Sequence, residues 1–411
     1  MSKTIHIIGA GLAGLSCAIK LKKNKKIILY EASSLFGGRC RSYNEKHFNC
    51  ILDNGNHLII KAYKNTFSYL KNINAHTKLI SNNKTFYPFV DIKKKENWSV
   101  RPYSYILPWW IFFSSCRPKN ISALDFIKSL KLFFAKKNET VYDLLGKNNI
   151  IYERFWKPFT IAVLNTDPKE ASAKLLRKVI IKTLFFSNDP LRPFLAKKSL
   201  NDSLIKPAVQ NFLDQGGKIK CNTRLKKIVF KNNFAKEMIF NKKKIKVDND
   251  EVIILAVTPN VASKIIPSLK VPKKTNCILN IHFKLNEKYK KIKFPENSFF
   301  IGVIGGTVDW IFKKKNILSI TISAANYLNN LGDEKISRIV WEDVKKTFNL
   351  NTIKKPKYKI IREKMATFVQ SPEEIFRKPK MHTKYKNILS ITISAANYLN
   401  NLGDEKISRI V

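Results

Sequence analysis

Runs of apolar residues near the start of the chain predict a strand, a helix and a second strand. Thr4–Ile8 (TIHII) is the first run, residues 15–22 have helical spacing, and Lys26–Tyr30 (KIILY) is the next strand. Later runs predict strands at residues 252–259, 277–285, 307–312 and 317–323, and a helix over residues 333–348. This succession is typical of an α/β fold.

A glycine-rich turn joins the first strand to the helix. It reads Gly9-Ala10-Gly11-Leu12-Ala13-Gly14, the G-x-G-x-x-G pattern, in which the glycines permit a tight turn, a close approach to a pyrophosphate and close helix–strand packing. The helix N-terminus then offers N–H groups to the phosphates. The second strand ends at Glu31-Ala32, where an acid that binds a ribose is expected. We therefore assign dinucleotide binding to Gly9, Ala10, Gly11, Ala13, Gly14, Glu31 and Ala32.

A second glycine motif follows the second strand. Gly37-Gly38-Arg39 precedes Ser42 in a G-G-R-x-x-S pattern, which a plain NAD dehydrogenase has no reason to carry. The motif resembles that of the flavin-binding amine oxidase and phytoene desaturase superfamily. The resemblance implies FAD as the cofactor, with Gly37 and Gly38 close to its diphosphate and Arg39 adding charge and hydrogen bonds.

Four further segments resemble one branch of that superfamily, the hydroxysqualene dehydroxylases, and the resemblance covers roughly residues 3 to 386. They are Asp53-Asn54-Gly55-Asn56-His57, the stretch 155–166 (FWKPFTIAVLNT) with 170–173, the stretch 363–368 (EKMATF, where Met365 replaces an Arg) and 377–379 (RKP). The resemblance implies that the backbone of Gly55, Asn56 and His57 lies beside the isoalloxazine ring. It also places Leu225 at the adenine and Ala256 in a strand that returns to the FAD domain.

The expected architecture is a discontinuous Rossmann-type FAD-binding domain with an inserted α+β substrate domain. We expect residues 1–70, 200–262 and 355–386 in the FAD-binding domain. Residues 71–199, mostly helical, and 263–354, mostly stranded, would form the substrate domain.

The C-terminal residues repeat an earlier segment. Residues 386–411 (KNILSITISAANYLNNLGDEKISRIV) match residues 315–340 letter for letter. The family would continue here with A-G-D-W and E-G-A segments that close the flavin site. We interpret the second copy as an artefact of assembly or rearrangement that replaces this segment, so the chain as written is expected to be impaired. The alternative is a tolerated duplication whose strand, 388–394, fills the missing place.

The resemblance implies reductive removal of an allylic hydroxyl group, converting hydroxysqualene to squalene in hopanoid or sterol precursor synthesis. Reduced flavin would deliver hydride while the hydroxyl leaves as water, and the protein would orient and protonate. His57 is the candidate catalytic proton donor, with a structural histidine as the alternative. Candidate substrate contacts are Trp156, Asn165, Thr166, Trp310 and Phe368, with Trp109, Trp110 and Phe159 as further aromatic candidates. Core packing and, for Asn165 and Thr166, helix capping are the alternatives.

Other activities remain open. A carotenoid desaturase or another amine oxidase-like flavoenzyme is the nearest rival. A basic lipid-binding protein with a vestigial Rossmann core is the non-enzymatic alternative. No pair of histidines at metal-binding spacing is found, so no metal site is expected.

The composition of the chain is unusual mainly in its net charge. With 76 Lys and Arg against 30 Asp and Glu, the net charge is +46. An AT-rich genome would produce this bias by itself; attraction to an anionic membrane is the functional alternative, and no nucleic-acid motif appears. Residues 103–116 (YSYILPWWIFFSSC) are too short to span a bilayer but suit its surface, with Lys128, Lys131, Lys136 and Lys137 following. Six scattered cysteines indicate a reduced chain in the cytoplasm. If residues 103–116 dock on the inner membrane, the protein would be a peripheral membrane protein.

Overall fold

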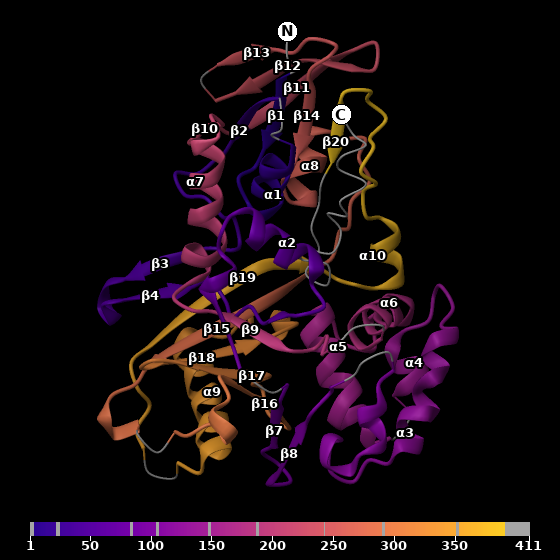
Figure 1. Cartoon of the computed structure of the whole chain (residues 1–411), viewed down its shortest axis with the longest axis vertical. Coiled ribbons are helices and arrows are strands. Elements are labelled where there is room, and N and C mark those ends of the chain that lie inside the picture. Colours follow the sequence, from indigo (N-terminus) through magenta and orange to yellow (C-terminus); the bar gives the residue numbers. More distant parts are fainter. Residues whose placement is uncertain are drawn as a thin grey trace.

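The structure is a computed structural model that describes residues 4–21, 25–82, 85–103, 107–146, 149–185, 189–241, 243–289, 292–350 and 353–390. Figure 1 shows a parallel sheet with its helices at the end that carries the N-terminus, and a larger sheet and a helical lobe at the other end. The long strands β15 (Thr275–Lys284) and β19 (Tyr358–Phe368) of the larger sheet cross the middle of the view.

The parallel sheet carries the glycine-rich turn. Its strand order is β10-β2-β1-β14-β20, with bounds β1 Thr4–Ile8, β2 Lys26–Tyr30, β10 Lys218–Lys220, β14 Val252–Leu255 and β20 Ile388–Ser390. All of its pairings are parallel, and the strands come from three separate parts of the chain. Helices α1 (Leu12–Leu21), α7 (Lys206–Asp214) and α8 (Pro259–Ile265) accompany the sheet. The Rossmann-type, discontinuous α/β prediction is confirmed.

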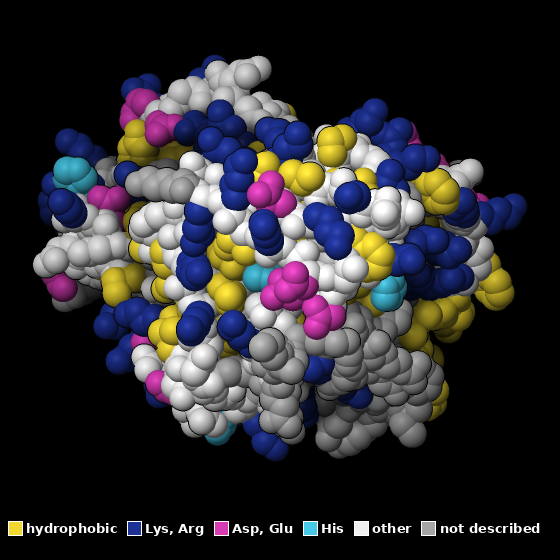
Figure 2. Space-filling model, turned by 90° about the horizontal axis from the view of Figure 1, so that it is seen from above, with side chains coloured by type: hydrophobic (Ala, Val, Ile, Leu, Met, Phe, Trp, Pro, Cys, Tyr) yellow, Lys and Arg dark blue, Asp and Glu magenta, His cyan; other side chains and the backbone are white. Residues whose placement is uncertain are grey.

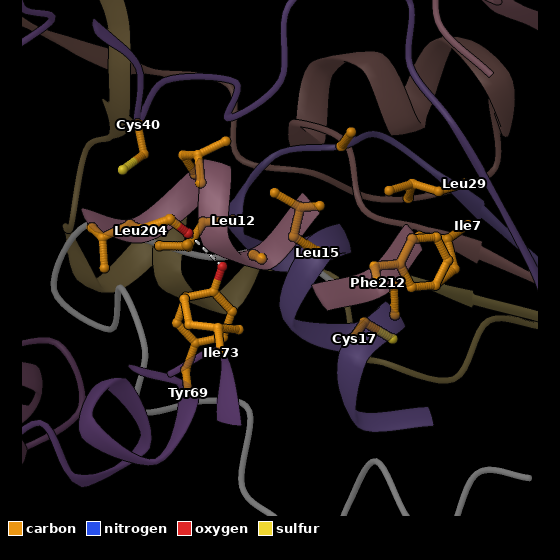
Figure 3. Packing of buried hydrophobic residues seen from close by; sticks show 14 of the residues in the cluster. Ile7, Leu12, Leu15, Cys17, Leu29, Cys40, Tyr69, Ile73, Leu204 and Phe212 are labelled. Atoms are coloured by element: carbon orange, nitrogen blue, oxygen red, sulfur yellow. Dashed lines mark hydrogen bonds between the residues drawn. The ribbon is translucent and has the colours of Figure 1, made fainter. Parts of the chain in front are cut away.

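A buried apolar cluster joins this sheet to its helices (Figure 3). The picture shows Leu12 of α1 beside Leu204, and Leu15 and Cys17 on the side of Phe212 of α7, while Tyr69 donates its hydroxyl to the Leu204 carbonyl at 2.6 Å. Tyr69 belongs to α2 (Lys64–Asn72), so the cluster anchors the segment after β5 (Ile59–Ile60) to the Rossmann core.

Smaller sheets flank the parallel one. An antiparallel sheet contains β11 (Leu225–Lys231), β12 (Phe234–Phe240) and β13 (Lys244–Lys246), and a hairpin contains β3 (Ser42–Glu45) and β4 (Cys50–Asp53). A three-stranded sheet has the order β5-β9-β6, with bounds Ile59–Ile60, Pro193–Ala196 and Leu79–Ser81.

The larger sheet has seven strands in the order β19-β15-β18-β17-β16-β7-β8. Their bounds are β7 Tyr87–Asp91, β8 Glu96–Val100, β15 Thr275–Lys284, β16 Phe300–Ile304, β17 Trp310–Lys314, β18 Ile317–Ile322 and β19 Tyr358–Phe368. Helix α9 (Asp333–Phe348) covers it through Ile336, Val340 and Val344, which pack into the core of the sheet. The helical lobe contains α3 (Ala123–Lys128), α4 (Val141–Leu145), α5 (Lys157–Leu164) and α6 (Ala173–Leu184), and α10 (Pro372–Phe376) lies near it.

Three features differ from the expected organisation. Strand β19 pairs with β15 over most of its length, so residues 358–368 belong to the larger sheet although we expected residues 355–386 in the FAD domain. The hairpin β7–β8 completes the same sheet from within a segment expected to be mostly helical. The strand expected at 307–312 starts at Trp310, because the Thr307 and Val308 N–H groups bind the Asp343 carboxylate in a turn.

The repeated segment occupies two different environments. Residues 388–390 form β20 and pair in parallel with β14, whereas the matching residues 317–319 lie inside the antiparallel sheet. Asn387 fastens β20 by exchanging side-chain hydrogen bonds with the Ala235 backbone at 2.8 and 3.1 Å. Residues 391–411 lie outside the described part of the chain. Among the helices of the described ranges, none combines the length and apolarity needed to cross a bilayer.

Candidate flavin site and adjoining cavity

The three fingerprint glycines meet different surroundings. Gly9 has a φ of +106°, which disfavours any side chain there. A Cβ on Gly14 would lie 1.9 Å from the Gly9 carbonyl oxygen, so this glycine lets α1 pack against the end of β1. A Cβ on Gly11 would meet nothing closer than 4.0 Å. The backbone at Gly11 therefore faces open space at the N-terminus of α1, as a diphosphate cradle requires.

Glu31 binds the backbone of this turn through its carboxylate. Its carboxylate accepts hydrogen bonds from the Ala10 N–H at 2.8 Å and from the Ser33 N–H at 2.9 Å. Ala32 is exposed next to it, and Ala13 packs inward in α1. The acid thus stands at the end of β2, beside the loop that it was predicted to accompany.

The second glycine motif lies against the first. Gly37 has a φ of +97° and donates its N–H to the Ala10 carbonyl at 2.9 Å, and Gly11 and Gly37 form an isolated bridge. Gly38 is exposed next to it. The Arg39 guanidinium donates to the carbonyls of Ala366 and Met365 at the end of β19. One cation therefore links the glycine loops to the larger sheet.

The segment from Asn54 to His57 is held by side-chain amides. Asn54 donates to the Arg39 carbonyl at 3.1 Å and to the Glu363 carboxylate at 3.2 Å. Asn56 donates to the Thr321 hydroxyl at 3.1 Å. These bonds fix the backbone of residues 54–57 between the Rossmann sheet and the larger sheet.

His57 lines the cavity described next. Burial lowers its pKa below the usual 6.5; the Asp53 charge raises the pKa and Arg39 lowers it, and burial prevails. The imidazole is therefore mostly neutral at pH 7.

A cavity of about 300 Å³ begins at these residues and continues into the substrate domain. At the Rossmann end it is lined by Leu12, Arg39, Cys40, Gly55, Asn56, His57 and Ala366. Its far end is mainly apolar and aromatic, with Tyr63, Tyr87, Phe89, Phe155, Phe159, Val163, Leu191, Trp310 and Phe312. One hollow thus joins the candidate flavin position to an apolar chamber, the arrangement typical of a site for an apolar small molecule.

The predicted substrate contacts divide into two groups. Trp310 and Phe159 line the cavity, as does Asn165. Trp156 and Phe368 are buried and are not among the lining residues; the Trp156 indole donates to the Ser129 hydroxyl at 2.8 Å. Phe155 takes the place that we expected for Trp156.

Asn165 and Thr166 have structural partners. Asn165 ends α5 with a φ of 48°, donates to the Thr367 hydroxyl at 2.9 Å and accepts from the Ala324 N–H at 2.7 Å. The Thr166 hydroxyl donates to the Leu164 carbonyl and accepts from the Gln370 N–H, each at 3.0 Å. Both side chains therefore have partners within the protein, mostly in distant segments and not at the end of α5, and Thr166 does not line the cavity.

The two remaining cofactor candidates lie near the Rossmann sheet. Ala256 follows β14 and donates its N–H to the Ile8 carbonyl at 2.9 Å, beside Gly9. Leu225 is buried at the start of β11, two residues after Thr223, whose N–H binds the Glu31 carbonyl at 2.8 Å.

Sequence reasoning missed several lining residues. Tyr63, Tyr87, Asn280 and Thr321 all face the cavity, and Asn280 donates to the Asn54 carbonyl at 3.2 Å. The strand of residues 277–285 was predicted, but alternation alone does not tell which face of it meets a distant loop. Tyr63 and Tyr87 had no motif around them that could have identified them.

These features define a flavoprotein of the Rossmann type with an apolar substrate chamber. The model of the family described as flavin containing amine oxidoreductase matches residues 12–363, and the chain belongs to that family. It is 32% identical over 389 residues to the hydroxysqualene dehydroxylase of Sinorhizobium fredii, covering 94% of this chain and 92% of the relative. The hydroxysqualene dehydroxylase of Zymomonas mobilis is also 32% identical, with 93% and 91% covered.

Other similarities are more remote. Cyclohexylamine oxidase from Brevibacterium oxydans superposes with a TM-score of 0.73 at 12% identity, covering 100% of this chain and 99% of that one, which shows the shared fold. The zeta-carotene desaturase of Capsicum annuum is 35% identical over only 77 residues, 18% of this chain and 13% of the relative. The resemblance to the carotenoid branch is thus confined to a short segment.

Proposed function

We propose that this chain is an FAD-dependent oxidoreductase that removes the hydroxyl group of hydroxysqualene to give squalene. The observation that carries the proposal is the apolar cavity that starts at Arg39 and residues 55–57 and continues among aromatic side chains. The similarity to hydroxysqualene dehydroxylases along almost the whole chain supports the same substrate.

The proposed cofactor contacts follow from the geometry of the loops. The open backbone at Gly11, with Ala10, Ala13 and the α1 N-terminus, would hold the diphosphate, and Gly37, Gly38 and Arg39 would flank it. Gly9 and Gly14 would shape the turn, Glu31 and Ala32 would meet the ribose, and Leu225 and Ala256 would border the adenine side. Gly55, Asn56 and His57 would lie beside the flavin ring.

The protein's part in the reaction is orientation, exclusion of water and proton delivery. Reduced FAD supplies a hydride when bound. Trp310, Phe155 and Phe159 give the allylic carbon an apolar, aromatic environment, in which a developing positive charge is stabilised by ring faces. His57, at the ring end of the cavity, is the proposed donor of the proton with which the hydroxyl leaves as water.

The test uses the purified full-length chain. We expect flavin absorbance in the protein and, under anaerobic conditions with reduced flavin, conversion of hydroxysqualene to squalene measured by gas chromatography; FAD is supplied in excess, because the repeated C-terminal segment is expected to impair cofactor binding. A matched control omits the reductant, and a separate assay gives phytoene to the protein with oxidised flavin and a quinone as electron acceptor, because desaturation oxidises its substrate. Turnover of phytoene without squalene formation would favour a carotenoid desaturase, and a colourless protein that binds lipid would favour the vestigial Rossmann alternative.

We also propose that the helical lobe docks on an anionic membrane. A surface patch there, the lobe patch, exposes Trp109, Phe112, Phe113, Leu124, Ile127 and Phe134, of which Phe134 is 82% exposed. Lys128, Lys131, Lys136 and Lys137 are interspersed with it in the sequence. Apolar side chains among cations are the features of a surface that lies in a lipid headgroup region.

The segments that carry the lobe patch also pack behind the cavity wall. Trp110 and Phe126, which neighbour the exposed Trp109 and Ile127 in the sequence, are buried and contact Phe155 with ring centroids 6.0 and 5.2 Å apart. Phe155 lines the cavity, so a lipid-dissolved substrate would have a short path inward. The positive charge is not confined to the lobe: Figure 2 shows Lys and Arg spread over the face at the other end of the molecule. We propose a cytoplasmic protein that binds the membrane peripherally.

A further inference from the structure

Tyr63 lies where the Rossmann core, the helical lobe and the cavity meet. It packs against the apolar cluster of the parallel sheet and also against that of the lobe. It lies three residues after the end of β5 at Ile60, and its N–H binds the Ile60 carbonyl at 2.9 Å. Its position on the chain is six residues after His57, and both side chains line the cavity.

The Tyr63 hydroxyl has no hydrogen-bond partner among the described residues, and burial alone raises its pKa, to about 12. The phenol is therefore neutral at every physiological pH and has a hydrogen to donate. Tyr63 is half-buried and lines the cavity, so water or a ligand in the cavity can supply the acceptor that the protein does not.

Tyr87 is a natural comparison within the same cavity. Its hydroxyl donates to the Leu191 carbonyl at 2.5 Å, and its pKa is raised by burial, with smaller contributions from Tyr63 and Asp189. Tyr87 therefore lies near Tyr63, but the hydrogen of its hydroxyl is already bonded to a carbonyl of the protein.

Most other donors on the cavity wall are also occupied. The Arg39 guanidinium binds backbone carbonyls, and His57 has a partner. The side chains of Asn54, Asn56, Asn165, Asn280, Thr183 and Thr321 all donate to protein acceptors.

We propose that the Tyr63 hydroxyl donates a hydrogen bond to the hydroxyl oxygen of the substrate and so selects an alcohol over the hydrocarbon formed from it. The inference rests on the proposed function, since it takes hydroxysqualene as ligand and squalene as product. The bond also orients the C–O bond to be broken, and its loss on conversion to the hydrocarbon weakens retention of the product. A polar contact of this kind discriminates better than apolar packing, because the two molecules differ in little but the hydroxyl.

The experiment compares binding of the two molecules to the oxidised holoenzyme, in which no turnover occurs. Dissociation constants for hydroxysqualene and squalene in detergent micelles are measured from the flavin absorbance change for wild type, Tyr63→Phe and Tyr87→Phe. We expect Tyr63→Phe to weaken hydroxysqualene binding about 3- to 10-fold, the value of one neutral hydrogen bond, and to leave squalene binding unchanged. Tyr87→Phe should leave the ratio of the two constants as in wild type.

Each outcome decides the proposal. An unchanged ratio in Tyr63→Phe, or equal weakening of both ligands, would overturn it. Melting curves of the variants exclude misfolding, and a methyl ether of hydroxysqualene gives an independent test in wild type, because it accepts but cannot donate. Binding of the ether at least as tight as that of squalene supports donation by Tyr63, and weaker binding than squalene argues against it. If wild type does not convert hydroxysqualene, the proposed function fails and this inference with it; if it converts the substrate but Tyr63→Phe keeps the ratio, only the role of Tyr63 fails.

Discussion

Alanine at Gly11 and alanine at Gly14 should affect different properties of the protein, although the two glycines belong to one motif. At Gly14 the new Cβ would lie 1.9 Å from the Gly9 carbonyl oxygen, more than 1 Å inside any tolerated contact, so α1 must move away from β1. Overpacking of this kind costs about 1–3 kcal/mol. At Gly11 the new Cβ meets nothing closer than 4.0 Å, and its φ is not positive.

The expected magnitudes follow from this contrast. Gly14→Ala should lower the melting temperature of the apoprotein by about 4–8 °C for a cost of about 2 kcal/mol, because 1 kcal/mol corresponds to about 2–4 °C in a domain of 150–250 residues. Gly11→Ala should leave it unchanged or raise it slightly, because alanine restricts the unfolded chain. The methyl group would instead exclude the diphosphate, and losing one hydrogen bond to a charged group, about 1.5–3 kcal/mol, weakens FAD binding about 10- to 150-fold.

Two measurements on the same preparations separate these effects. Thermal unfolding of the apoproteins is followed by circular dichroism, and FAD affinity is measured by quenching of flavin fluorescence. Wild-type FAD affinity in Gly11→Ala would refute the assignment of this loop to the diphosphate. Wild-type melting of Gly14→Ala would refute the packing argument.

Three further predictions concern protonation and the membrane. His57→Ala should keep FAD bound but lower turnover about 100-fold. Because the His57 pKa lies below 6.5, the wild-type rate should rise as the pH falls toward 6.5. Equal turnover in both proteins would remove His57 from the mechanism. Trp109→Ser combined with Phe112→Ser should weaken binding to acidic liposomes in a sedimentation assay, and added salt should weaken it too. Binding that neither change affects would rule out docking through the lobe patch. Burial lowers the pKa of His282 to about 4, whereas the same side chain in the unfolded chain titrates near 6.5. As the pH falls below 6.5, the unfolded chain therefore binds a proton that the folded protein does not. The free energy of unfolding should drop by about 3 kcal/mol between pH 6.5 and pH 4 from this group. His282→Gln should remove that part of the decline in urea unfolding, and an identical pH profile would contradict the buried, neutral assignment.

The cofactor end of the molecule was largely predictable because its chemistry lies in local sequence. The G-x-G-x-x-G turn, the strands on either side and Glu31 fall within one short stretch, and the turn geometry needs glycine for reasons of backbone conformation and contact that apply wherever the motif occurs. The strand at residues 277–285 and the helix at 333–348 were likewise evident from periodicity, and the structure has them at Thr275–Lys284 and Asp333–Phe348.

The substrate end depended on contacts between distant segments. Trp156 was a candidate and its neighbour Phe155 was not, yet the turn of the helix directs Trp156 to Ser129 and Phe155 to the cavity. Asn165 and Thr166 looked like candidates for binding a hydroxyl until Thr367 and Gln370, some 200 positions away, proved to be their partners. Tyr63 had no motif to mark it.

The repeated segment shows that local sequence can determine an extended conformation without determining the sheet that the strand joins. Lys-Asn-Ile-Leu-Ser occurs at residues 315–319 and again at 386–390, and both copies have the apolar, β-branched character that makes a strand. The first copy pairs antiparallel with β15 and β17, and the second pairs in parallel with β14. Sequence alone determined that each would be extended. Which sheet it joined, and in which direction, was decided by the unpaired strand edge within reach, because backbone hydrogen bonds along an edge do not depend on which side chains the arriving strand carries.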